Sequence, residues 1–139
     1  MSRTASRIAL FSALILSVLS CSEPLSTEKF IRGDGPYEFT VEMADSLARY
    51  DFDLFTRIDA KSCPGEAALI VRWVSPSDST FRETVYLPLK CGDVYEPYRK
   101  GCVPVEYGTW KCIVAVPEAV SIDGFRGLGL VVRRDYGTR

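Results

Sequence analysis

The chain has 139 residues, of which 47% are hydrophobic and 25% charged, and its 17 basic and 18 acidic residues give a net charge of −1. This composition is typical of one globular domain. Because the chain contains no histidine, it cannot form Ser-His-Asp or Cys-His catalytic sites, or zinc sites that use an imidazole ligand. The near-neutral charge also argues against nucleic-acid binding, which normally requires a basic excess.

The N-terminal residues have the pattern of a lipoprotein signal peptide. Two arginines precede an apolar run over 8–19 that leads into the sequence VLSC at 18–21. As a helix, this run would rise only about 18 Å, which is short of the ~30 Å hydrocarbon core, so export and cleavage are favoured over a membrane span. We expect residues 1–20 to be removed and Cys21 to carry acyl chains that hold the protein at a bilayer.

Cleavage would leave a mildly acidic protein, because the two arginines leave with the signal peptide and the net charge changes from −1 to −3. Ser22 follows the lipidated cysteine, where an Asp would retain an enteric lipoprotein in the inner membrane, so the outer membrane is favoured. Residues 22–34 are polar and lack a period. We therefore expect residues 21–35 to be a lipidated N-terminus and tether, and residues 36–139 to form the globular domain.

Six segments of this domain have the pattern of β-strands. In 37–43 and 50–59, apolar and polar residues alternate with the period of a strand that has one buried and one wet face. The segment 68–74 is apolar on both faces, which is typical of a central strand. Further strands are expected over 81–87, 110–116 and 128–132. We predict an all-β antiparallel sandwich, immunoglobulin-like or jelly-roll-like, with about six strands.

Four cysteines remain besides Cys21, and as an even set in an exported chain they predict two disulfides in one of three connectivities. They are Cys63, Cys91, Cys102 and Cys112. A four-cysteine zinc site is disfavoured, because spacings of 28, 11 and 10 contain no CxxC pair.

The segment 106–112 (EYGTWKC) is similar to strand F of immunoglobulin domains, and Trp73 lies between Cys63 and Cys112 as the tryptophan of that fold does. The preferred pairing that follows from this resemblance is Cys63 with Cys112, which leaves the other two cysteines to each other.

The irregular segment 90–108, expected to be a long loop or a pair of short edge segments, carries Tyr95, Tyr98 and Tyr107. These tyrosines are the candidate binding surface, because they could stack on a sugar or a protein partner. The alternative is that they cover the end of the sandwich.

Two other patterns are expected to be structural. Asp51, Asp53 and Asp59 share the wet face of one predicted strand, where we expect solvated carboxylates and no calcium site. The glycines of 124–129 (GFRGLG) resemble a phosphate-binding loop, but a strand continues at 128–132, which favours a bulge or close strand packing. We expect no catalytic residues, no metal and no cofactor.

Several of these features occur in an order that has a known counterpart. They are the lipobox Cys21, the strand with Phe39, the run 50–58 (YDFDLFTRI), residues 69–71 leading into Ser75-Pro76, the strand opening at 108–110 (GTW), and 122–124 (IDG) before a Gly-rich closing strand. This pattern resembles the gliding-motility lipoprotein H family of Bacteroidetes (GldH). The resemblance implies a small, non-enzymatic envelope lipoprotein associated with the gliding machinery and its linked secretion system.

The sequence thus leads to two functional hypotheses. The first is a lipid-anchored structural or accessory component of a gliding-motility and secretion-linked complex, with envelope proteins as partners and an outer-membrane location. The second is a lipid-anchored module that binds a glycan or a peptide through Tyr95, Tyr98 and Tyr107.

Overall fold

The computed structural model describes residues 25–61, 63, 65–92 and 95–137. These residues form eight β-strands and one short 3-10 turn, η1 (Ala119–Ser121). The strands are β1 (Ser26–Arg32), β2 (Tyr37–Met43), β3 (Arg49–Ile58), β4 (Glu66–Val74), β5 (Thr80–Pro88), β6 (Tyr98–Cys102), β7 (Gly108–Ala115) and β8 (Phe125–Asp135). No helix within the described ranges has the length and apolar character needed to span a bilayer.

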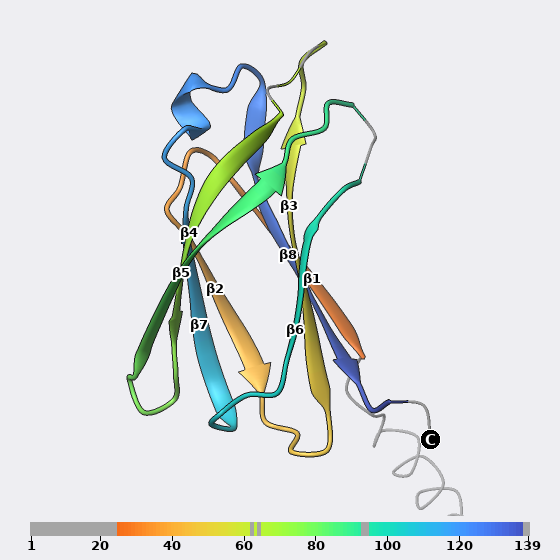
Figure 1. Cartoon of the computed structure of the whole chain (residues 1–139), viewed down its shortest axis with the longest axis vertical. Helices are drawn as coiled ribbons and strands as arrows, with labels where there is room; N and C mark the ends of the chain where they lie inside the picture. The colour runs from red at the N-terminus through yellow and green to blue at the C-terminus, as the bar shows by residue number, and fades with distance from the viewer. Residues whose placement is uncertain (1–24, 62, 64, 93–94, 138–139) are drawn as a thin grey trace, which may run out of the picture.

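The strands form two antiparallel four-stranded sheets that face each other (Figure 1). Sheet A has the order β1-β8-β3-β6, and sheet B has the order β2-β7-β4-β5. Every connection crosses from one sheet to the other except the β4–β5 hairpin, whose turn is closed by the Ser75 amide donating to the Ser79 carbonyl at 2.8 Å. This order is that of a jelly roll, so the predicted antiparallel sandwich is confirmed, and its topology is not that of an immunoglobulin domain.

The alternation of apolar and polar residues along each strand decides which of its side chains are buried between the sheets. In β2 the four odd-numbered residues are buried and the three between them are exposed. In β3, Tyr50, Phe52, Leu54 and Ile58 point into the core, where each is at most 4% exposed. Burying such a side chain stabilises a domain by roughly 1.5–3 kcal/mol, so the interior between the sheets supplies most of the favourable free energy.

All six predicted strands are present, as β2, β3, β4, β5, β7 and β8. The short strand β6 lies in 90–108, where a pair of short edge segments was one of two expectations, and β1 was not expected. The strand β1 lies within the segment that we expected to be a tether, so the folded domain begins by Ser26 and not at residue 36. It was missed because it is an edge strand with a mostly exposed polar sequence, STEKFIR. Backbone pairing with β8, from Ser26 opposite Arg133 to Arg32 opposite Gly127, holds it in sheet A.

The loops divide between the two ends of the sandwich (Figure 1). One end, which we call the N-terminal end, holds the start of β1, the β2–β3 loop, the β4–β5 turn, the β6–β7 loop and the end of β8. The opposite end holds the β1–β2, β3–β4 and β5–β6 loops and η1. Segments far apart in the sequence therefore meet at each end.

Close packing of β1 on β8 depends on Gly127, which has a φ of 148°. A Cβ at this position would overlap the Ile31 carbonyl oxygen of β1. We expect Gly127→Ala to lower the free energy of unfolding by about 1–3 kcal/mol in urea denaturation, because one strand must shift and the backbone is strained. Gly65→Ala is the matched control: a Cβ there meets nothing within 4 Å, so a change below about 0.5 kcal/mol is expected. Equal stability of the two variants would show that β1 packs differently.

Candidate functional site

The outward face of sheet A carries the most elaborate cluster of polar side chains in the described residues. The strand β3 places Asp51, Asp53, Phe55 and Arg57 on this face, because Phe52 and Leu54 between them point into the core. At the position of Asp53, β6 contributes Arg99 on one side and β8 contributes Val131 on the other. The face is thus built from strands that lie far apart in the sequence.

Asp53 is fully buried even though it lies on the outward face, because three side chains close over it. Arg99 donates from Nε to Oδ1 at 2.9 Å and from Nη2 to Oδ2 at 3.2 Å. Arg133 donates from Nη1 to Oδ2 at 3.0 Å and from Nη2 to Oδ1 at 2.8 Å. The hydroxyl of Tyr95 donates to Oδ2 at 2.9 Å. We call these four residues the Asp53 cluster.

The protonation states in the Asp53 cluster follow from these contacts. Burial alone would raise the pKa of Asp53, but the hydrogen bonds from Arg133, Arg99 and Tyr95 outweigh it and hold the pKa well below its usual range. Burial and the bond to Asp53 raise the pKa of Tyr95 to about 12. At neutral pH the carboxylate is therefore ionised and the phenol keeps its proton. Two guanidinium groups on one carboxylate leave the cluster with a positive charge.

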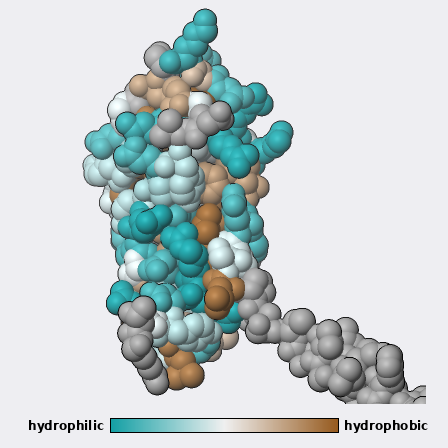
Figure 2. All heavy atoms as spheres, turned by 90° about the vertical axis from the view of Figure 1, so that its right-hand side faces the viewer, coloured by the Kyte–Doolittle hydropathy of each residue, from teal (hydrophilic) through white to brown (hydrophobic). Residues whose placement is uncertain are grey.

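A cavity of about 610 Å³ adjoins the Asp53 cluster. Its lining combines charged, aromatic and aliphatic groups: Glu28, Phe55, Thr56, Arg57, Ile58, Asp59, Gly92, Tyr95 and Val131. Figure 2 views the molecule from this side, where mainly hydrophilic side chains surround a few hydrophobic ones. We call this hollow the sheet A cavity.

Aromatic rings form one wall of the sheet A cavity. The ring of Phe55 lies 5.3 Å from the ring of Tyr95 in an edge-on arrangement and 6.0 Å from the stacked ring of Phe30, measured between centroids. The guanidinium carbon of Arg57 lies 5.1 Å from the centre of the Phe30 ring. Phe55 can lie flat on β8 because Gly129 is opposite it, and a Cβ at that glycine would overlap the ring.

Chemically, this arrangement suits recognition better than catalysis. Carboxylates and guanidinium groups can hydrogen-bond to hydroxyl groups, while ring faces and edges can contact the apolar side of a sugar or a peptide side chain. Asp53 already accepts five hydrogen bonds, so it has no capacity left to act as a base. Among the described residues, no group of three or more His, Cys, Asp or Glu side chains is placed to hold a metal ion.

The three predicted tyrosines do not form one surface. Tyr95 belongs to the Asp53 cluster and lines the sheet A cavity. Tyr98 is partly buried and packs against the core from β6. Tyr107 is exposed in the β6–β7 loop at the N-terminal end. The short strand β6, one of the edge segments that the sequence left open, separates the three side chains, and their binding role stays a prediction.

The predicted disulfide pairing was wrong. Cys63 is bonded to Cys91, with a Cα–Cα distance of 5.8 Å, and the bond joins the β3–β4 and β5–β6 loops at the opposite end of the sandwich. Cys112 is a free thiol on β7, buried between Phe39 of β2 and Trp73 of β4 in the register of sheet B. It cannot reach a loop at the end of the sandwich. Burial raises the pKa of the Cys112 thiol to about 12, which makes it unreactive.

Cys102, the other free thiol, lies half-buried at the open edge between the sheets. It borders a second, apolar cavity of about 280 Å³, whose walls include Phe52, Trp73 and Trp110. The ion pair between Lys100 of β6 and Glu83 of β5, at 2.9 Å, spans this edge. The predicted lipidation site, Cys21, lies outside the described residues.

One of the three aspartates departs from the expected solvated face. Asp53 is buried, whereas Asp59 lies at the surface and pairs with Arg126. Sequence reasoning missed Arg99, Arg133 and the role of Asp53. The signal that could have found them is Phe55, a large apolar residue in an otherwise polar row, which indicates that another segment covers this part of the strand.

No protein-family model matches the chain, and no curated protein is significantly similar to it.

The Asp53 cluster gives a test by mutation and pH. We expect Asp53→Asn to lower the free energy of unfolding by about 2–3 kcal/mol at pH 7, because two guanidinium groups lose their carboxylate. The folded-state pKa of Asp53 lies below its unfolded value of about 3.9. The stabilising contribution of the carboxylate is therefore complete above about pH 5 and is lost progressively as the pH falls from there toward the folded-state pKa. The difference between wild type and variant should therefore shrink in denaturation curves below about pH 4.

Asp51→Asn, on the same face of β3, is the matched control, with a change below about 0.5 kcal/mol expected at both pH values. A difference between wild type and Asp53→Asn that stays constant down to pH 2 would contradict the ionised, saturated carboxylate.

Proposed function

We propose that this chain is a non-enzymatic lipoprotein of the bacterial envelope, anchored through Cys21, which acts as a structural or accessory component of a gliding-motility and secretion-linked complex. The observation that carries the proposal is the lipobox sequence VLSC at 18–21, directly ahead of a folded domain that begins by Ser26. The resemblance to the GldH family supports the same assignment. An outer-membrane location belongs to the proposal, since Ser22 follows the cysteine.

A scaffold role also agrees with how the charged groups of sheet A are used. The carboxylate of Asp53 is saturated by Arg99, Arg133 and Tyr95, and the exposed carboxylate of Asp59 is paired with Arg126. These contacts hold β3, β6 and β8 together. The charged groups are therefore occupied in stabilising the fold, which supports the proposal of a non-enzymatic protein.

The anchor is tested by Cys21→Ala in the source bacterium. We expect the wild type to incorporate a labelled fatty acid and to sediment with the membrane fraction, and the variant to lose both properties, because the acyl chains supply membrane residence. Cys102→Ala serves as the control, since it removes a thiol at the sandwich edge and should leave acylation unchanged. Membrane retention of the Cys21→Ala variant at the wild-type level would refute the anchor.

The partner is tested by crosslinking a tagged, acylated chain in intact envelopes and identifying the copurifying proteins by mass spectrometry. Enrichment of motility or secretion components over the Cys21→Ala control supports the structural role. Enrichment of glycan-uptake proteins, or of nothing, would contradict it.

The second candidate is a glycan- or peptide-binding module, and the observation that favours it is the sheet A cavity, with Tyr95, Phe55 and Arg57 in its lining. We expect Arg57→Ala to weaken retention of a bound glycan by roughly tenfold, which corresponds to about 1.4 kcal/mol. Arg57 lies outside the Asp53 cluster, so the fold should persist, as circular dichroism can check. Arg82→Ala, an exposed arginine on sheet B, is the control. A glycan array on which wild type and Arg57→Ala bind alike, or neither binds, would reject this candidate.

A further inference from the structure

The N-terminal end of the sandwich gathers most of the exposed large apolar side chains of the described residues. Ten such side chains are exposed, and six of them lie at this end: Leu25, Leu47, Val103, Val105, Tyr107 and Tyr136. Leu47 is 78% exposed and Val105 is 73% exposed. The loops of the opposite end carry two, Val120 in η1 at 82% and Tyr95 in the β5–β6 loop at 53%, and the Tyr95 hydroxyl is bonded to Asp53. The apolar surface is therefore concentrated at one pole of the domain.

Hydrogen bonds fix the β2–β3 loop that presents Leu47. The Asp45 carboxylate accepts a bond from the Leu47 amide at 2.9 Å, and it also accepts one from the Tyr136 hydroxyl beyond β8. The Asp45 amide donates to the Tyr50 hydroxyl at 3.0 Å. Leu47 therefore projects from a turn that is held to the rest of the domain.

The β6–β7 loop, which presents Val105, is held in a similar way. The indole of Trp110 donates to the Glu106 carbonyl at 2.9 Å, and the Glu106 side chain accepts hydrogen bonds from Ser75 and Ser77 of the β4–β5 turn. These hydrogen bonds thus fix the loop conformation in which the Val105 side chain is exposed.

Chain length brings this end close to the bilayer, provided that Cys21 is acylated as the proposed function states. Only four residue steps separate Cys21 from Leu25, and in any conformation they span at most about 14 Å. The polar region on each side of a bilayer is roughly 5–8 Å thick. The start of β1 therefore lies at or just outside the headgroups, and with it the loops that carry Leu47 and Val105.

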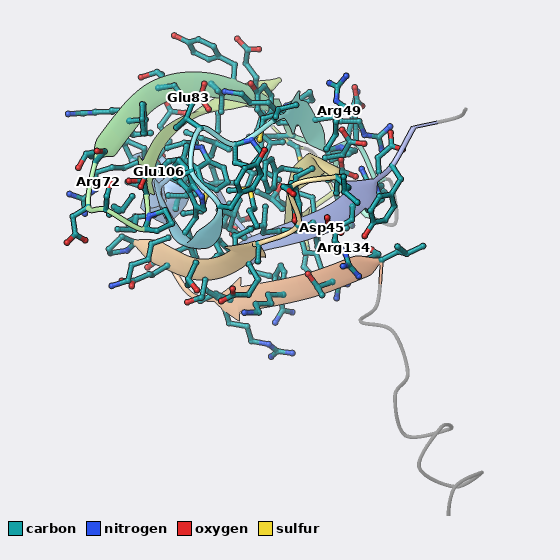
Figure 3. The ribbon with its side chains drawn as sticks, turned by 90° about the horizontal axis from the view of Figure 1, so that it is seen from below. Asp45, Arg49, Arg72, Glu83, Glu106 and Arg134 are labelled. Carbon is teal, nitrogen blue, oxygen red and sulfur yellow. A yellow bond between two sulfur atoms is a disulfide. The ribbon has the colours of Figure 1, made fainter. Side chains whose placement is uncertain are left out.

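The loops and strand ends at this end carry a small acidic excess, with Asp45, Asp78, Glu106 and Asp135 against Arg49 and Arg134. Figure 3 shows the end from below, with Asp45 and Arg134 near each other, Arg49 beyond them, and Glu106 toward the middle. Four acidic groups against two basic ones form no basic patch, which disfavours an anionic macromolecule. Apolar side chains flanked by tyrosines are, in contrast, the composition of protein surfaces that contact the membrane interface.

We propose that the N-terminal end of the sandwich rests on the lipid bilayer, with Leu47 and Val105 inserted among the headgroups. The long axis of the domain then points away from the membrane. The disulfide-linked loops and η1 face outward, and the sheet A cavity opens to the side.

The test uses the full acylated protein in vesicles of the zwitterionic lipids phosphatidylethanolamine and phosphatidylcholine, analysed by amide hydrogen exchange with mass spectrometry. The Cys21→Ser form in solution is the reference. We expect exchange in 44–48 and 103–107 to slow at least fivefold on the vesicles, while exchange in 119–124 at the opposite end stays unchanged.

A double variant, Leu47→Ser with Val105→Ser, should return both loops to the exchange rate of the solution form while remaining acylated and folded, because both side chains are exposed in the free domain. Val120→Ser, which removes an equally exposed side chain at the opposite end, should have no effect on these loops.

The outcomes separate the inference from the proposed function. An intact mass without acyl groups contradicts the proposed function and removes the basis of the inference. An acylated chain whose loops 44–48 and 103–107 exchange as fast on vesicles as in solution overturns the inference alone. Protection of these loops in native envelopes but not on pure lipid also overturns it, because a protein would then cover this end.

Discussion

The outward half of sheet A depends on the burial of one carboxylate. Asp53 lies on β3, and its partners come from β6, β8 and the loop ahead of β6, so a single side chain joins three strands and a loop. An isolated buried charge would cost several kcal/mol, which Arg99, Arg133 and Tyr95 offset with five hydrogen bonds. Once these bonds form, Tyr95 is fixed against Phe55, and one wall of the sheet A cavity is in place.

The two ends of the sandwich have different chemistry. The opposite end is tied by the disulfide between Cys63 and Cys91. The N-terminal end is tied by hydrogen bonds through Asp45 and Glu106, and it leaves its apolar loop residues exposed. A jelly roll produces this division because all but one of its connections cross between the sheets at one pole or the other. The fold itself carries many unrelated functions, so the functional proposals depend on these surfaces.

Strand periodicity was sufficient to predict most of the core, because β2 alternates strictly between buried and exposed residues and β3 buries Tyr50, Phe52, Leu54 and Ile58 in the core. It could not reveal β1, whose polar edge sequence is held by backbone pairing, and it left the segment of β6 open between a loop and short edge segments. The Asp53 cluster and the bond between Cys63 and Cys91 depend on which loops meet in space, and local pattern does not contain that information. The likeness to an immunoglobulin strand therefore led to a wrong cysteine pairing, although the sandwich itself was predicted correctly.

The position of β1 has a mechanical consequence if the chain is anchored at Cys21. The strand starts at the membrane-proximal end and runs along the long axis, paired with β8 over seven residues (Figure 1). A pull between the anchor and a partner bound to the rest of the domain would load these backbone hydrogen bonds in shear along the strand. In shear the bonds share the force and must yield together, whereas in peeling they break one at a time. An edge strand at the N-terminus is thus suited to transmit tension from the lipid to the domain.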